Sequence, residues 1–249
     1  MIYKKSPEEL EIMREGGRIL VDTLDALEES LHPGITTAEL DRIADERITG
    51  AGARPSFKGY RGFPASICAS PNNVIVHGIP GPTTLVEGDI ISLDVGVLWN
   101  GFHVDSAWTF PVGDVASEAR ELLKVAEASL DAAIEQCLPG KRLGDVGHAV
   151  ESTALAAGFS IVREYVGHGV GRSLHEEPQI PNYGPPGRRQ ALSSGMTVAI
   201  EPMVNLGGER TKVLGDGWTV ETLDGSLSAH FEHTVAIVEG GHEILTRRN

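Results

Sequence analysis

The order of the expected secondary structure repeats once along this chain, and that repeat limits the folds it can adopt. Each part begins with two segments whose apolar residues recur at a helical period and continues with shorter, strand-like runs. The helices are expected at residues 7–31, 37–51, 117–138 and 143–157. The strands are expected within residues 57–110 and at residues 160–166, 196–201, 218–222 and 229–238. This pattern predicts an α+β fold.

Matching residues support the repeat. Residues 88–94 match residues 195–201 at an offset of 107, and this match superposes Asp94 on Glu201. A Pro-Gly pair and an Ala-Gly pair also recur, each 106 residues later. Such pairs are common beside helices, but a nearly constant offset favours duplication over chance. We therefore expect one catalytic domain over residues 1–249, built of two related halves at about 1–110 and 111–249, with a pseudo-two-fold axis.

Composition excludes several classes of protein. The net charge is −14 and no run of Lys and Arg occurs, which argues against non-specific nucleic-acid binding. No apolar stretch reaches the roughly 18 residues of a membrane span, and residues 1–7 lack the apolar region of a secretory signal. The two cysteines form no zinc-binding CxxC pair. We expect a soluble protein of a reducing compartment, the cytoplasm.

Four carboxylates fall in strand-like segments that otherwise suit a buried core: Asp94, Asp105, Glu201 and Glu232. An unpaired buried carboxylate is costly, so several together imply cations that neutralise them. His168, which lies between glycines, adds an imidazole. Oxygen ligands with one imidazole indicate a hydrolytic divalent-metal site.

The turn expected at Asn100-Gly101 sets the geometry of the two aspartates. An Asn-Gly pair favours a two-residue hairpin turn, which places Gly96 opposite Asp105. Asp94 is then the diagonal neighbour of Asp105 on the same face, roughly 7–8 Å away at Cα. The pair could share one ion or bridge two. A register slip of one residue would send the two carboxylates to opposite faces.

The remaining histidines differ in what their surroundings indicate. His175 follows His168 by seven residues and suits a substrate-binding or supporting role. His77 ends an apolar strand before Gly-Ile-Pro, and its setting leaves open whether it belongs to a site. Two histidines near Glu232 are expected to be no more than its neighbours, namely His230 and His233.

Together these segments resemble the type I methionine aminopeptidases. The resemblance extends over nearly the whole chain, in order and spacing, and it implies the duplicated pita-bread α+β fold. The matching segments are residues 66–68, 76–80, 94–95, 105–106, 165–183, 201–203, 216–218 and 231–234.

The resemblance also implies a ligand set for two divalent ions of Co, Mn, Fe or Zn. Asp105 and Glu232 would bridge the ions, His168 and Glu201 would complete one, and Asp94 would complete the other. Two adjacent cations would activate a water molecule for attack on the peptide carbonyl. Catalytic roles are implied for His77, His175 and Glu201, with Glu201 accepting a proton. The substrate pocket would be lined by Tyr60, Phe63, Cys68, His77, Leu174, His175 and Trp218.

The implied function is removal of the N-terminal methionine from nascent polypeptides that have a small second residue. The expected oligomeric state is a monomer, and the ribosome is a possible binding partner. Two positions depart from the family. Val104 replaces a usual Gly, but by alternation it points away from the metal face. Leu174 replaces a usual Phe, which could loosen the methionine pocket.

Two alternative functions are compatible with the same fold. An Xaa-Pro metallopeptidase of the same fold would share the metal ligands, but such enzymes usually carry a large N-terminal domain, and the pocket residues Tyr60, Cys68 and Trp218 favour methionine. A metal-free binding module of the same fold would have lost ligands, whereas all five are present.

Overall fold

The computed structural model describes residues 2–248. The helices are α1 (Pro7–Ser30), α2 (Thr37–Gly50), α3 (Ser117–Ile134) and α4 (Leu143–Ala156), with a 3-10 turn η1 (Tyr60–Gly62). The strands are β1 (Arg54–Pro55), β2 (Ile67–Pro71), β3 (Val74–Val76), β4 (Ile90–Trp99), β5 (Phe102–Pro111), β6 (Ser160–Ile161), β7 (Gly167–Gly169), β8 (Glu176–Ile180), β9 (Thr197–Ile200), β10 (Met203–Asn205), β11 (Thr211–Val213), β12 (Val220–Thr222), β13 (Ser228–His230), β14 (His233–Val238) and β15 (Gly241–Ile244). All four expected helices are present, so the α+β prediction is confirmed.

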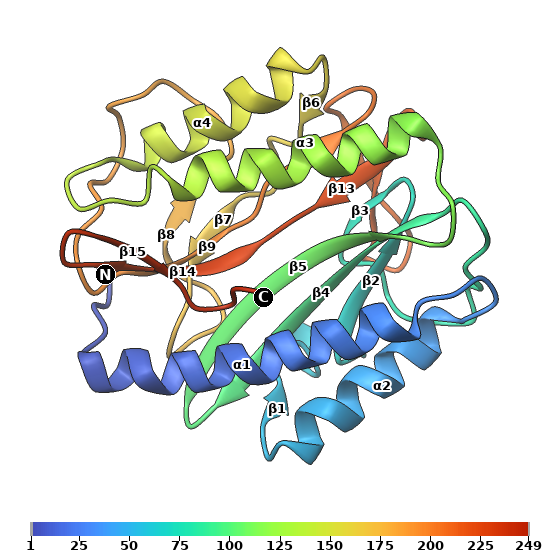
Figure 1. The fold of residues 1–249 in the computed structure, drawn as a ribbon, viewed down its shortest axis with the longest axis horizontal. Coiled ribbons are helices and arrows are strands. Elements are labelled where there is room, and N and C mark those ends of the chain that lie inside the picture. Colours follow the sequence, from blue (N-terminus) through green and yellow to red (C-terminus); the bar gives the residue numbers. More distant parts are fainter. Residues whose placement is uncertain (1, 249) are drawn as a thin grey trace.

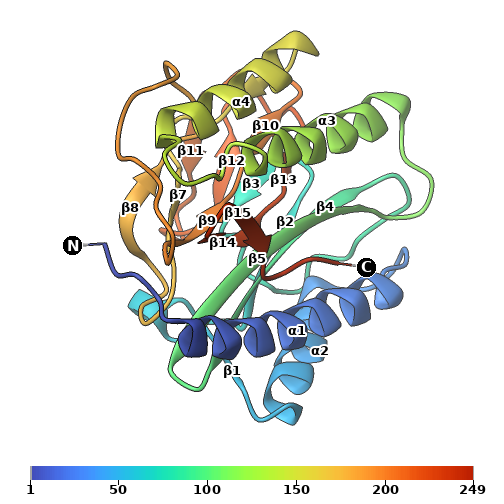
Figure 2. The same ribbon diagram turned by 60° about the vertical axis from the view of Figure 1, so that its left-hand side comes forward.

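The sheets lie between two pairs of helices. In Figure 1, α1 and α2 run below the strands while α3 and α4 run above them, and the turned view of Figure 2 shows the same layers. One apolar core lies between the α1–α2 pair and strands β2, β4 and β5. A second lies between the α3–α4 pair and strands that include β9, β10 and β13. The exact division into halves near residue 110 stays a prediction.

Helix α1 begins and packs as its sequence indicates. Ser6 is the N-cap: its hydroxyl accepts from the Glu9 amide, and the Glu9 side chain accepts from the Ser6 amide, which completes a capping box. Glycines on this helix allow a close approach to the rest of the chain. A Cβ on Gly17 would lie 2.0 Å from the Leu245 carbonyl oxygen. No helix among residues 2–248 is long and apolar enough to cross a membrane.

The hairpin of β4 and β5 has the expected register. Asn100 and Gly101 both have positive φ, 46° and 86°, as a type I′ turn requires. Gly96 lies opposite Asp105, and Asp94 lies opposite Ala107. The two aspartates are therefore diagonal neighbours on one face, as predicted.

Residues 229–238 were predicted to form one continuous strand. They form two strands, β13 and β14, so that prediction was wrong. β13 pairs with β10, and β14 pairs with β9. Between them the Glu232 amide donates to the Ala107 carbonyl on β5, and the Phe231 amide donates to Pro202. The chain changes partner strands here, which leaves the Glu232 side chain outside both ladders.

Two other strand predictions were too long. The strand expected over residues 160–166 ends at Ile161, and Arg163 beyond it pairs with Glu151 and Glu209 at the surface. The strand expected over residues 218–222 begins only at Val220. Asp216 accepts from the amides of residues 218 and 219, which holds that segment in a turn.

Substitution of Gly96 tests how closely the β4–β5 hairpin packs against residues 56–57. A Cβ at this position would lie 2.7 Å from Cε1 of Phe57 and 2.8 Å from Cβ of Ser56. We expect Gly96→Ala to lower the free energy of unfolding by about 1–3 kcal/mol because the pocket wall must shift. Urea denaturation measures this.

Gly50→Ala is the control, since a Cβ there meets nothing within 4 Å. It should leave stability unchanged or raised by up to about 1 kcal/mol. Equal stability of both variants would show that Gly96 is not required for packing.

Candidate metal centre and substrate pocket

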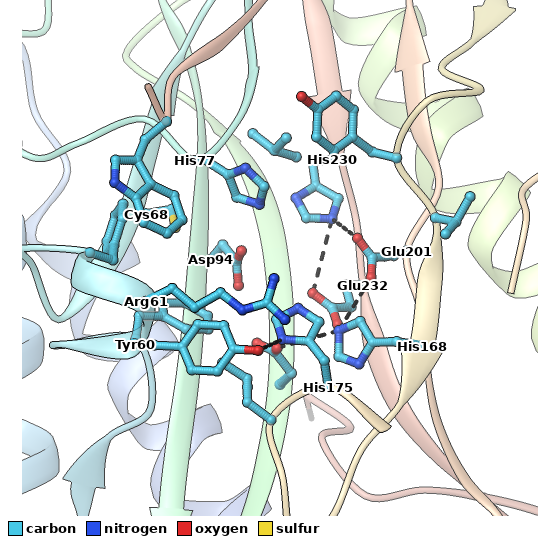
Figure 3. Close-up of a pocket in the computed structure, with 18 residues that line it drawn as sticks. Tyr60, Arg61, Cys68, His77, Asp94, His168, His175, Glu201, His230 and Glu232 are labelled. Atoms are coloured by element: carbon cyan, nitrogen blue, oxygen red, sulfur yellow. Dashed lines mark hydrogen bonds and ion pairs between the residues drawn. The ribbon is translucent and has the colours of Figure 1, made fainter. Parts of the chain in front are cut away.

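Every residue predicted for the metal centre, for catalysis or for substrate binding lines one pocket. The side chains come from many elements: β2, β4, β5 and η1 on one side, and β7, the loop before β8, β9 and the β13–β14 junction on the other (Figure 3). Residues distant in sequence therefore converge as expected. Their individual roles stay predictions.

The donor atoms at the centre lie close enough to share cations. One ligand atom each from Asp105, His168 and Glu232 lies within 4.8 Å of the others. His168 Nε2 lies 3.5 Å from Glu201 Oε1 and 3.9 Å from Asp105 Oδ2. Asp94 is the diagonal neighbour of Asp105 on the hairpin and lies across the pocket from Glu201 and His168 (Figure 3).

Several of these oxygens are buried without a protein partner. Within residues 2–248, Asp94 Oδ1, Asp105 Oδ1 and Glu232 Oε1 have no hydrogen bond. Buried polar atoms in native proteins are almost always satisfied. Carboxylate oxygens without donors, beside an imidazole, fit divalent cations well.

The orientation of His168 supports the same interpretation. Its Nδ1 lies 2.9 Å from the Gly169 carbonyl oxygen. A carbonyl only accepts, so Nδ1 carries the proton and Nε2 presents a lone pair to Asp105 and Glu201. That lone pair faces carboxylate oxygens, an arrangement that is repulsive unless a cation lies between them or a carboxyl group is protonated.

Burial raises the pKa of each acidic group, and repulsion from neighbouring carboxylates adds to the rise for Asp94, Glu201 and Glu232. Burial, together with the charges of the neighbouring carboxylates, raises the pKa of Asp94, Glu201 and Glu232 well above the usual range. Burial raises the pKa of Asp105 to about 7. Burial lowers the pKa of His168 to about 4, which keeps its imidazole neutral. A bound cation would reverse the acidic shifts by favouring the ionised carboxylates.

Short hydrogen bonds hold the ligand-bearing strands together. The Asp105 amide donates to Thr234 Oγ1, and that hydroxyl donates back to the Asp105 carbonyl. The Ser106 hydroxyl donates to the Glu232 carbonyl at 2.6 Å. These bonds fix β5 against the β13–β14 junction, so Asp105 and Glu232 stay adjacent. On the other side, the Asn182 amide group donates to the Glu201 carbonyl.

One end of the pocket is apolar. Phe63, Cys68 and Leu174 are buried there and pack with Tyr60 and Trp218. The Phe63 and Trp218 rings meet edge to face with centroids 5.2 Å apart. An unbranched apolar side chain suits such a wall.

Two histidines lie between this wall and the carboxylates. His175 Nδ1 lies 2.9 Å from the Tyr60 hydroxyl, and its ring lies 4.2 Å from that of His168. His77, whose setting in the sequence was ambiguous, also lines the pocket, with φ of 59°. Burial is the main cause that lowers the pKa of both imidazoles, to about 3 for His175. Each is therefore a neutral hydrogen-bonding group.

The structure gives more weight to His230, which the sequence indicated to be no more than a neighbour of Glu232. His230 lines the pocket, with Nε2 3.8 Å from Glu201 Oε2. Its spacing of two residues from Glu232 was the available signal, since residues two apart in a strand share a face. His233 instead bonds Thr246 through Nδ1, as a neighbour with a structural contact. Val104 points away from the metal face and packs against Gly16 of α1.

Comparison with known proteins identifies a family and similar proteins. The family model described as metallopeptidase family M24 matches residues 11–239. The chain is 54% identical to methionine aminopeptidase 1 of Bacillus subtilis (strain 168), over 99% of this chain and 100% of that protein. It is also 54% identical to the methionine aminopeptidase of Clostridium perfringens (strain 13 / Type A), over 99% of each.

Solved structures give the fold. The crystal structure of methionine aminopeptidase from Rickettsia prowazekii superposes with a TM-score of 0.98 at 41% identity, covering 99% of this chain and 100% of that one. Prolidase from Pyrococcus furiosus superposes with a TM-score of 0.80 at 23% identity, covering 99% of this chain and 66% of that one. The latter shows the fold alone. The predicted pita-bread fold is confirmed.

The repulsion among the carboxylates predicts that removing one of their charges stabilises the metal-free protein. In metal-free protein, Asp94→Asn should raise the free energy of unfolding by at least about 1 kcal/mol near pH 8, because each unit of raised pKa opposes folding by about 1.4 kcal/mol. A carboxyl with a raised pKa costs stability only while ionised. The gain should therefore shrink as pH falls toward about 5. Urea unfolding in chelator measures it.

Asp216→Asn is the control, because it should change the free energy of unfolding in the opposite direction. Hydrogen bonds from Thr219 and the Trp218 amide lower the pKa of Asp216, so its ionised form stabilises the fold. That variant should lose stability near neutral pH. A loss of stability in metal-free Asp94→Asn as well would contradict the proposed repulsion.

Proposed function

This chain belongs to metallopeptidase family M24 and acts as a methionine aminopeptidase, and we propose that two divalent ions and the pocket side chains carry out its reaction. The substrate is a polypeptide with an N-terminal methionine, and the bond hydrolysed is the one that follows it. We propose that nascent chains with a small second residue are preferred. The observation that supports this most directly is the junction of an apolar pocket with a buried carboxylate cluster.

Membership of a metallopeptidase family implies divalent metal use. We propose that Asp105 and Glu232 bridge two ions, that His168 and Glu201 complete one, and that Asp94 completes the other. The buried oxygens that lack a partner in residues 2–248 support this assignment, as does the lone pair of His168 Nε2. Oxygen ligands with imidazole suit Co, Mn, Fe or Zn.

The ions, when bound, supply Lewis acidity and lower the pKa of coordinated water. The protein contributes the proton transfers. Glu201, partly buried beside the centre, is placed to accept a proton and return it to the leaving amine. Its carbonyl is fixed by Asn182, so its position is defined before substrate binds.

His175 and His77 are placed to bind the substrate's peptide group. The contact between His175 Nδ1 and the Tyr60 hydroxyl orients that ring and leaves Nε2 available. A neutral imidazole can donate to the peptide oxygen, and such a bond strengthens as negative charge develops. Leu174 and Trp218 would enclose the methionine side chain and exclude water from it.

The Xaa-Pro alternative is less supported. Prolidase and related dipeptidase and X-Pro aminopeptidase structures are 18–23% identical to this chain, which covers 62–66% of their length. They share the fold, but the high-identity relatives are named methionine aminopeptidases. We further propose, from the family resemblance, a cytoplasmic monomer that meets its substrates at the ribosome.

A tripeptide assay tests the activity. The protein supplied with manganese or cobalt should release free methionine from Met-Ala-Ser. Asp105→Asn should lower kcat/KM about a thousandfold, because a lost bridging ligand removes several kcal/mol of transition-state stabilisation. The exposed Asp22→Asn on α1 is the matched control and should retain full activity. Equal cleavage of Leu- or Pro-initiated peptides would refute the methionine assignment.

Metal removal tests the cofactor. Dialysis against a chelator should abolish methionine release, and added divalent metal should restore it. Because the ions bind only the folded state, metal at 100 times its Kd should also add about 2.7 kcal/mol to the free energy of unfolding. Undiminished turnover in the dialysed protein, with metal content verified as negligible, would exclude metal catalysis.

A further inference from the structure

His230 is a buried histidine whose backbone is anchored while its ring is not. The His230 amide donates to Thr109 Oγ1 at 2.9 Å, and the Thr109 hydroxyl donates to the His230 carbonyl at 2.8 Å. The residue is 1% exposed. Neither ring nitrogen has a hydrogen-bond partner within the described part of the chain.

The ring points at two of the proposed metal ligands. His230 Nε2 lies 3.8 Å from Glu201 Oε2 and 4.0 Å from Glu232 Oε2. The other oxygen of Glu201 lies 3.5 Å from His168 Nε2. The Glu201 carboxylate therefore lies between two imidazoles, with His230 above it and His168 below it in Figure 3.

A purely structural role does not account for these contacts. A buried imidazole that only supports packing normally has a hydrogen-bond partner, as His233 has in Thr246. The distances from His230 to the carboxylates are too long for hydrogen bonds. They are compatible with atoms that share an ion, because two ligands each about 2.0–2.2 Å from a metal lie up to roughly 4 Å apart.

We propose that His230 is an additional nitrogen ligand of the metal centre, placed between Glu201 and Glu232. This inference rests on the metal site proposed above and extends its ligand set from five side chains to six. A second imidazole changes the preference of the site. Nitrogen donors favour cobalt and zinc, whereas carboxylates alone suit manganese. His230 thus selects for the later metals.

Metal binding, measured without turnover, tests this role. Metal-free wild type and His230→Gln are titrated with Co(II) and with Mn(II) against a competing chromophoric chelator. We expect His230→Gln to weaken Co(II) binding tenfold or more, as loss of a metal-supporting side chain typically does. Mn(II) binding should weaken less. The visible spectrum of bound Co(II) should change, because one nitrogen ligand is lost.

His233→Gln is the matched control, since it removes a buried histidine from the same segment that does not face the pocket. It should bind both metals as wild type does. His230→Ala provides a second arm: added free imidazole should restore the wild-type Co(II) spectrum if the ring is a ligand. Thermal unfolding without metal verifies that each variant is folded.

The outcomes distinguish the proposal that His230 is a ligand from the proposal of the five-ligand metal site. Co(II) affinity within twofold of wild type and an unchanged spectrum in His230→Gln would overturn the role of His230 and leave the five-ligand site standing. Absence of any divalent binding by wild type would overturn both. A loss of Co(II) affinity in His230→Gln, with imidazole rescue of His230→Ala, would support the sixth ligand.

Discussion

The repulsion among four carboxylates, two of them buried and two partly buried, is the constraint on which the structure depends. Asp94, Asp105, Glu201 and Glu232 lie in one pocket, and burial together with their mutual charge raises the pKa of the group. Such a cluster opposes folding unless cations bind or protons are taken up. The protein tolerates it because backbone and hydroxyl bonds, including the Asp105–Thr234 pair, hold the strands in place.

The two-core architecture places this cluster where the strands of both parts meet. The β4–β5 hairpin, packed against α1, supplies the aspartates. The sheet that joins β14, β9 and β7 supplies His168 and carries Glu201 at its end. Because each side is fixed by its own apolar core, the ligands meet with little freedom to separate. The same meeting point leaves an apolar cavity beside the ligands for a substrate side chain.

Much of this could be predicted from local sequence signals. Asn100-Gly101 specified the hairpin, and the hairpin specified that Asp94 and Asp105 share a face. The capping box at Ser6 and the apolar periodicity specified the helices. What could not be predicted depends on tertiary contacts. The break at Phe231–Glu232 arises because Glu232 bonds to β5 rather than continuing the ladder.

Anomalous diffraction from crystals grown with manganese tests the central claim most directly. The account predicts two adjacent anomalous peaks inside the pocket, both contacting Asp105 and Glu232, with Glu201 and Asp94 on opposite sides. The two-metal site would be contradicted by well-diffracting crystals in which these side chains are ordered but no anomalous peak lies among them.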